Sequence, residues 1–175
     1  FYFYPTVINM KIVIVGAGPI GMSTLLTSQF YSPSKIIMVD LDENRLEESK
    51  RFGATHTVIS KDSAAAIKEI MDITGGRGVD VAIEAAGFPA TFDICQRVLA
   101  PGAHLANVGV HGKSVDLQLQ YLWIKNVTIT TGLVSTSSTP MLLKTLATDK
   151  INVDDLVTHT FKFKDVLKAY DTFQN

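Results

Sequence analysis

Three glycines and one aspartate have types and spacing that point directly to chemistry: Gly16, Gly18, Gly21 and Asp40. The glycines follow the β-branched run 12–15, which is typical of a buried parallel strand, at the spacing G-x-G-x-x-G. In such a loop the first glycine permits a tight turn, the second admits a pyrophosphate, and the third lets the next helix pack on its strand. The pattern predicts a binding site for a dinucleotide.

The helix expected at this loop would bind the phosphates without a lysine, because its free N–H groups and the positive end of its dipole attract anions. Asp40 ends the next predicted strand, 36–39, about 20 residues after Gly21, where an acid accepts hydrogen bonds from the adenosine ribose. Its charge would repel a 2′-phosphate, which favours NAD over NADP. The other residues expected at this part of the site are Pro19, Ile20 and Leu41.

The rest of the chain alternates short apolar strands with helical segments that end near glycine or proline. This alternation specifies an α/β fold, here a doubly wound parallel sheet of the Rossmann type in three layers with strand order 3-2-1-4-5-6. The expected strands are 12–15, 36–39, 57–59, 79–84, 103–108 and 127–131. The expected helices are 43–52, 64–74 and 89–99, preceded by one with an apolar face of Met22, Leu25, Leu26 and Phe30.

Two more loops at the carboxyl edge of this sheet are small or apolar: Ala85, Ala86 and Gly87 after the fourth strand, and Val108, Gly109 and Val110 after the fifth. Small side chains suit the faces of an adenine, and apolar ones suit a nicotinamide. The alternative is that each loop is a plain turn at the end of a strand.

Composition excludes several classes of partner. The 175 residues, 46% hydrophobic, suffice for one domain, and a net charge of −1 gives no field that would attract nucleic acid or an anionic membrane. We expect neither partner. The single cysteine fits a reducing, cytoplasmic location. The aromatic opening, 1–10, lacks the basic and apolar regions of a signal peptide and is expected to be an N-terminal remnant of an upstream region.

With these motifs in place, the chain from 11 to 173 resembles the medium-chain dehydrogenases, and among them the zinc-type alcohol dehydrogenases. The matching pieces are Val15–Gly21, Asp40–Leu46, Phe52–Thr55, Gly76–Asp80, Glu84–Gly87, Pro101–Gly102, Asn107–Val110 and Thr158–Phe161. The resemblance implies hydride transfer between an alcohol or carbonyl substrate and NAD. It also implies that Asp40 and Arg45 contact the adenosine ribose. Ala85 and Ala86 would lie by the adenine, and 108–110 by the nicotinamide. Arg45 could equally be a solvated charge on a helix face.

The resemblance also implies a separate catalytic domain that this chain lacks and that would carry the zinc. The only thiol or imidazole groups here are those of Cys95 and of the histidines at 56, 104, 111 and 159, and none forms a cluster at metal-ligand spacing. We therefore expect no metal site and assign no catalytic residue in this chain. The expected organisation is a remnant at 1–10, an NAD-binding domain at 11–150, and at 151–175 the start of a return segment toward the catalytic domain. The chain alone is expected to be inactive.

Several further residues carry weaker hypotheses. Cys95 is expected to be buried and inert, and His111 to be solvated, although it could relay a proton. Tyr121 and Lys125 match a Tyr-x-x-x-Lys catalytic pair, but the serine that should accompany them is absent, so Tyr121, Leu122 and Trp123 are interpreted as packing residues.

Two hypotheses concern partners. The chain could be part of a dehydrogenase or, alternatively, a stand-alone module that senses NAD(H). The strand 127–131 is expected at the edge of the sheet and would form a homodimer or homotetramer, unless 133–146 covers it.

Overall fold

The computed structural model describes residues 9–174, so most of the predicted remnant at 1–10 lies outside the described residues. The chain divides into two compact units, one that ends at Ser135 and one that begins at Thr136. The first unit holds the sheet and every residue of the predicted site.

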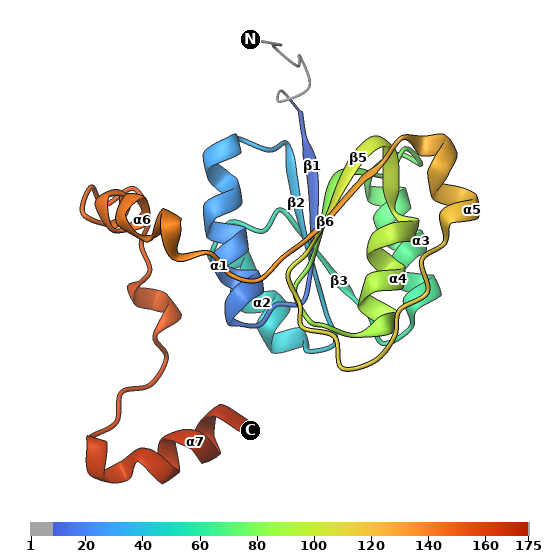
Figure 1. Cartoon of the computed structure of the whole chain (residues 1–175). Coiled ribbons are helices and arrows are strands. Elements are labelled where there is room, and N and C mark those ends of the chain that lie inside the picture. The colour runs from blue at the N-terminus through green and yellow to red at the C-terminus, as the bar shows by residue number, and fades with distance from the viewer. Residues whose placement is uncertain (1–8, 175) are drawn as a thin grey trace. The chain divides into compact units, whose positions relative to one another are not determined.

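Six parallel strands form one sheet with the order β3-β2-β1-β4-β5-β6, which confirms the predicted doubly wound fold (Figure 1). The central strands β1 and β2 are short runs of buried aliphatic residues, as expected where helices cover both faces. The strands are β1 (Lys11–Val15), β2 (Lys35–Asp40), β3 (His56–Ile59), β4 (Val79–Glu84), β5 (Leu99–Asn107) and β6 (Thr128–Thr131).

Helices α1 and α2 lie on one face of the sheet and α3 and α4 on the other, which gives the three layers (Figure 1). Aspartates begin two of these helices: the Asp42 side chain accepts from two N–H groups of α2, and Asp62 accepts from one of α3. The helices of the first unit are α1 (Pro19–Ser28), α2 (Glu43–Arg51), α3 (Ser63–Ile73), α4 (Pro89–Arg97) and α5 (Leu119–Leu122), with 3₁₀ turns η1 (Gln29–Tyr31) and η2 (Trp123–Lys125).

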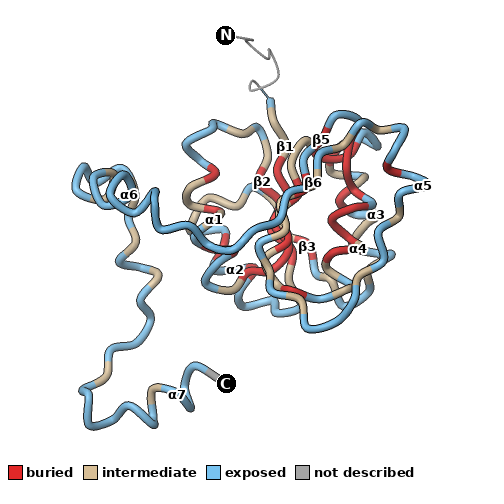
Figure 2. The backbone as a smooth tube through the Cα atoms, in the orientation of Figure 1, coloured by how far each residue is buried: buried red, intermediate tan, exposed pale blue. Residues whose placement is uncertain are grey.

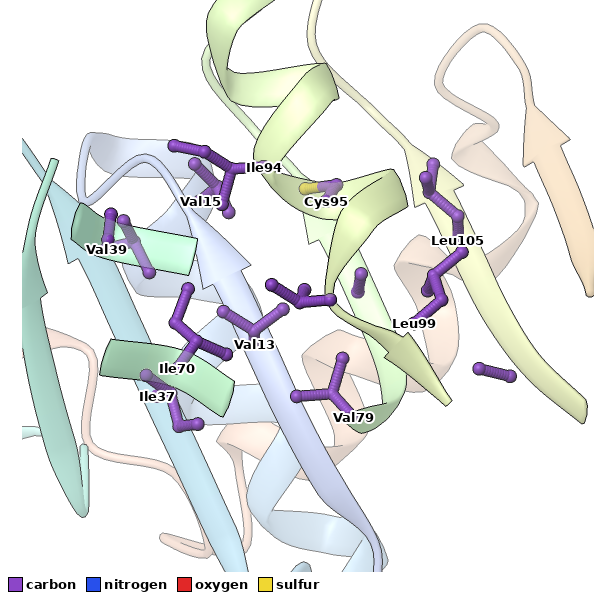
Figure 3. Close-up of a cluster of buried hydrophobic side chains, with 14 of the residues drawn as sticks. Val13, Val15, Ile37, Val39, Ile70, Val79, Ile94, Cys95, Leu99 and Leu105 are labelled. Atoms are coloured by element: carbon purple, nitrogen blue, oxygen red, sulfur yellow. The ribbon is translucent and has the colours of Figure 1, made fainter. Parts of the chain in front are cut away.

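Burial concentrates on the middle of the sheet and on the helix faces that cover it (Figure 2). One large cluster packs between the sheet and the pair α3 and α4 (Figure 3). It includes Val13 and Val15 of β1, Ile37 and Val39 of β2, Ile70 of α3, and Ile94 and Cys95 of α4. This core holds the carboxyl ends of β1, β2 and β4 in place, and the predicted site lies at those ends.

Some local predictions are wrong. Phe30 does not lie on a buried helix face, because the chain tightens into the 3₁₀ turn η1 after Ser28 and leaves Phe30 49% exposed. Leu122 is buried as expected, but its neighbours Tyr121 and Trp123 are exposed. Strand β5 begins at Leu99 instead of 103, because Leu99 pairs with Val79 across a bulge in the β4–β5 ladder. The helix expected over 89–99 therefore ends at Arg97.

The second unit is mostly helical: η3 (Thr136–Ser138), α6 (Thr139–Leu146), η4 (Asp154–Leu156), η5 (Phe163–Asp165) and α7 (Val166–Gln174). Val166, Tyr170 and Phe173 all lie in α7. Within residues 9–174, none of the helices has the length and apolar character that a membrane span requires.

Candidate functional site

The loop after β1 contacts both strand β2 and the loop after β4. The Gly16 N–H donates to the Val39 carbonyl at 2.7 Å, and the Ala85 N–H donates to the Val15 carbonyl at 2.9 Å. Gly16 has φ +110°, and a Cβ on it would lie 3.0 Å from the Ala85 carbonyl carbon. Glycine is therefore required at 16, both for this backbone conformation and for the close approach of the two loops.

The second and third glycines have opposite surroundings. A Cβ on Gly21 would lie 1.8 Å from the Gly16 carbonyl oxygen, so helix α1 can pack this closely only on glycine. A Cβ on Gly18 would have no atom within 4 Å. Gly18 precedes the first turn of α1, which has no side-chain cap and no acidic residue. The open space at Gly18 and the uncapped helix end fit a bound pyrophosphate.

Asp40 ties the end of β2 to the glycine-rich loop. Its Oδ2 accepts from the Ala17 N–H at 2.6 Å, and its Oδ1 accepts from the Asp42 N–H at 3.0 Å. The neighbouring Leu41 side chain is exposed. Arg45 is also exposed, and its Nε lies 3.9 Å from Asp42 Oδ2. A pair of this kind contributes little to stability. The carboxylate of Asp40 thus has a fixed position, and Arg45 has an exposed side chain in the first turn of α2.

Glu84 is the residue of this region whose role the sequence analysis missed. It ends β4 and is fully buried, at 0% exposure. Its Oε1 accepts from the N–H groups of Ala86 and Gly87 at 3.0 and 2.8 Å. Its backbone carbonyl accepts from the N–H groups of Val108 and Gly109 at 2.9 and 3.0 Å. One residue therefore binds both of the loops that were expected to contact flat rings.

His111 is not solvated, so that prediction is wrong. Its side chain is only 15% exposed, and its Nε2 lies 2.8 Å from Asn107 Oδ1 and 3.3 Å from Glu84 Oε2. The ring packs edge-on against Phe92, with centroids 6.0 Å apart. The loop can fold back in this way because residue 87 is a glycine. A Cβ at this position would lie only 2.4 Å from the Val110 carbonyl oxygen.

Cys95 is buried, as expected (Figure 3). Burial in α4 raises the pKa of its thiol well above the usual value, and the negative charge of Glu84 raises it further. Because the thiolate is the reactive form, both effects disfavour reaction at this thiol. Across the described residues no group of three or more His, Cys, Asp and Glu side chains could hold a metal ion.

The carboxyl edge of the sheet also presents apolar side chains to solvent, namely Ile20, Leu41, Val108 and Val110. They follow β1, β2 and β5, beside the small residues after β4. Parallel strands bring all these loops to one edge, so the predicted residues share that edge, with Arg45 in the first turn of α2 directly after β2. An anion-binding helix end beside exposed apolar surface is suited to a molecule with phosphates and flat rings.

The strand order and the glycine-rich turn at the centre of the sheet define the class of Rossmann-like α/β domains. The sequence model of one family, described as zinc-binding dehydrogenase, matches residues 19–148. The chain belongs to this family, which confirms the resemblance seen in its motifs.

Two curated relatives illustrate the family. An alcohol dehydrogenase of Cupriavidus necator is 31% identical over 172 residues, which cover 96% of this chain and 47% of the relative. The sorbitol dehydrogenase of Homo sapiens is 31% identical over 165 residues, 94% of this chain and 46% of the relative. The chain thus spans about half the length of the curated relatives it matches.

Two solved structures of alcohol dehydrogenases superpose closely on this chain. A zinc-dependent alcohol dehydrogenase 2 from Streptococcus pneumonia, in its apo form, superposes with a TM-score of 0.92 at 57% identity, covering 95% of this chain and 48% of the other. A benzyl alcohol dehydrogenase from Acinetobacter calcoaceticus superposes with a TM-score of 0.82 at 32% identity, covering 95% and 47%.

Proposed function

We propose that this chain is the NAD(H)-binding domain of a zinc-type alcohol dehydrogenase. The observation that carries the proposal is the contrast between Gly21, which is closed against the Gly16 carbonyl, and Gly18, which faces open space at the uncapped end of α1. A glycine with no neighbour within 4 Å is not required by the packing of the domain. It is explained by a ligand whose phosphates approach the backbone there.

The remaining residues have these proposed roles. Asp40 accepts hydrogen bonds from the adenosine ribose, Ala85 and Ala86 flank the adenine, and the loop 108–110 faces the nicotinamide. Bound NAD accepts or returns the hydride of an alcohol substrate. We assign the catalytic zinc to a catalytic domain outside the NAD-binding domain, 11–150, with 151–175 leading back to it. The cytoplasmic location remains a prediction. The family match favours this function over a stand-alone NAD(H) sensor.

Binding of NADH by the purified chain tests the function. We expect the 175-residue chain to bind one NADH in a fluorescence or calorimetric titration, to retain no zinc after purification, and not to oxidise alcohols. Gly18→Val should weaken NADH binding by about 100-fold or more, because the side chain occupies the space of the pyrophosphate. Its melting temperature should be unchanged, since no atom lies within 4 Å of that position.

Ala65→Val is the control for this experiment. Ala65 is exposed in α3, which covers the face of the sheet opposite to α1, so this variant also enlarges an exposed side chain but away from the glycine-rich loop. This variant should bind NADH as the unmodified chain does. An unmodified chain that fails to bind NADH would contradict the proposal. So would tightly bound zinc together with alcohol turnover that chelation abolishes.

We further propose that the family's association into homodimers or homotetramers uses β6 of this chain. Strand β6 pairs only with β5 within the described sheet, so it lies at an edge. The strand, Thr128–Thr131, contains no proline or lysine that would hinder pairing with another strand. A second copy presenting the same strand would satisfy the outer row of N–H and C=O groups.

Proline substitution tests this edge, because successive N–H groups of a strand point to opposite sides. Of Thr128→Pro and Ile129→Pro, one removes a bond to β5 and the other removes a bond to the second copy. We expect the variant that loses the bond to the second copy to sediment as a monomer that keeps its melting temperature and NADH affinity. An unmodified chain that is monomeric at high concentration, as it would be if 133–146 covered the edge, contradicts this assignment.

A further inference from the structure

Glu84 links two loops that approach each other closely at the proposed cofactor site. On one side its Oε1 binds the N–H groups of Ala86 and Gly87, and the Thr91 hydroxyl lies 2.6 Å from the same oxygen. On the other side a Cβ on Gly109 would lie 2.3 Å from Glu84 Oε2. The carboxylate therefore fills the space between the loop 85–88 and the loop 107–111.

The second carboxylate oxygen faces His111. The Asn107 side chain donates from Nδ2 to the Gly109 carbonyl at 3.1 Å, so its Oδ1 faces His111 and accepts from the ring Nε2 at 2.8 Å. His111 Nε2 must then carry the proton, and it lies 3.3 Å from Glu84 Oε2. Among the described residues, Glu84 Oε2 has no other polar partner and no hydrogen bond of good geometry.

These contacts lie on the inner side of surfaces that the proposed function gives to the cofactor. Val110 is 90% exposed on the outer side of its loop, and its carbonyl oxygen lies against Gly87. A shift of the loop 107–111 relative to Glu84 would therefore move Val108 and Val110 relative to the nicotinamide. The adenine side would move less, because Ala86 is held by the other carboxylate oxygen.

We propose that Glu84 is a positioning residue for the cofactor, which acts with His111 to set the nicotinamide-facing loop against the rest of the site. The proposal rests on the proposed function as an NAD(H)-binding domain. Oε1 fixes the adenine side of the site through Ala86 and Gly87, and Oε2 fixes the nicotinamide side through His111 and the close contact with Gly109.

Two variants separate the two oxygens. In Glu84→Gln the amide oxygen can replace Oε1, but the amide NH₂ then faces the protonated Nε2 of His111, so that two donors meet. His111→Ala removes the ring and leaves the bonds to Ala86 and Gly87 in place. Each variant should weaken NADH binding by about tenfold, the effect expected for one charge-assisted contact. Affinity for ADP-ribose, which lacks the nicotinamide, should change by less than about twofold.

The double variant gives an independent readout. Because His111→Ala removes the donor that opposes the amide of Glu84→Gln, the two effects should not add, and the double variant should bind NADH about as well as either single variant. Ile70→Val is the stability control, since Ile70 is buried in α3 and belongs to the core cluster. It should lower the melting temperature without changing either affinity.

The outcomes distinguish this inference from the proposed function. If the unmodified chain does not bind NADH, the proposed function fails. If it binds NADH but both single variants bind within about twofold of it, the positioning role is wrong. Equal losses of NADH and ADP-ribose affinity that follow the melting temperature would show a purely structural role and would also overturn the inference.

Discussion

Gly21→Ala is expected to destabilise the first unit by about 2–4 kcal/mol and to abolish NADH binding. The added Cβ would lie 1.8 Å from the oxygen and 2.9 Å from the carbon of the Gly16 carbonyl, and both are backbone atoms. Gly16 cannot withdraw, because it donates to the Val39 carbonyl at 2.7 Å and lies against Ala85. Helix α1 must move away from β1 instead, which opens the core at Leu25 and misplaces the N-terminus of the helix.

Urea unfolding followed by circular dichroism measures this effect. For a domain of ordinary stability, about 5–15 kcal/mol, the expected loss is a large fraction of the total. Gly18→Ala is the matched control within the same loop, because its Cβ would meet no atom within 4 Å and the unfolding midpoint should not change. An unchanged midpoint for Gly21→Ala would show that α1 does not pack on β1 through this glycine.

Asp40→Asn is expected to raise affinity for NADP by roughly 10- to 100-fold while lowering affinity for NAD only modestly. The repulsion between a carboxylate and one phosphate charge about 4 Å away is roughly 4 kcal/mol near a protein surface. Screening by solvent ions reduces this energy. The amide oxygen of asparagine can still accept the Ala17 N–H, now bonded to Asp40 Oδ2 at 2.6 Å. The substitution therefore removes the charge and retains the bond that holds the loop, but it loses the bond from the Asp42 N–H, which would then face the amide NH₂.

Parallel titrations with NADH and NADPH measure the preference. Glu43→Gln is the control for a general loss of negative charge, since Glu43 begins α2 nearby and forms an exposed ion pair with Lys61 at 3.0 Å. It should leave both affinities unchanged. Equal affinity of the unmodified chain for the two cofactors would contradict the proposed role of Asp40. The absence of any gain in NADPH binding by Asp40→Asn would contradict it as well.

The order of the strands was predictable because its signals are local. A buried aliphatic run followed by a glycine or an acid marks both β1 and β2, and the alternation with helices leaves few other topologies. The environments of Gly16 and Gly21 follow from the same pattern, and the distances to neighbouring atoms agree with it. The local sequence thus determines the backbone at the centre of the site.

The role of Glu84 was missed and His111 was misjudged because their environment depends on contacts between loops distant in sequence. A glutamate is rarely buried, so an acid at a strand end is by default interpreted as exposed. The available signal was the run Ala85–Ala86–Gly87 directly after it, which provides backbone N–H groups for a buried carboxylate to bind. His111 has no comparable signal, because the path of its loop is set by the absence of side chains on Gly87 and Gly109.

The position of β1 in the middle of the sheet has a consequence for how the chain is made. Strand β1 pairs with β2 on one side, Ile12 with Ile36, and with β4 on the other, Ile12 with Val81. During synthesis from the N-terminus, the half sheet of β1, β2 and β3 is complete long before β4 leaves the ribosome. Until then β1 presents an unpaired edge, aliphatic from Ile12 to Val15, of the kind that promotes aggregation. Chains that terminate between Ile59 and Val79 would keep that edge permanently.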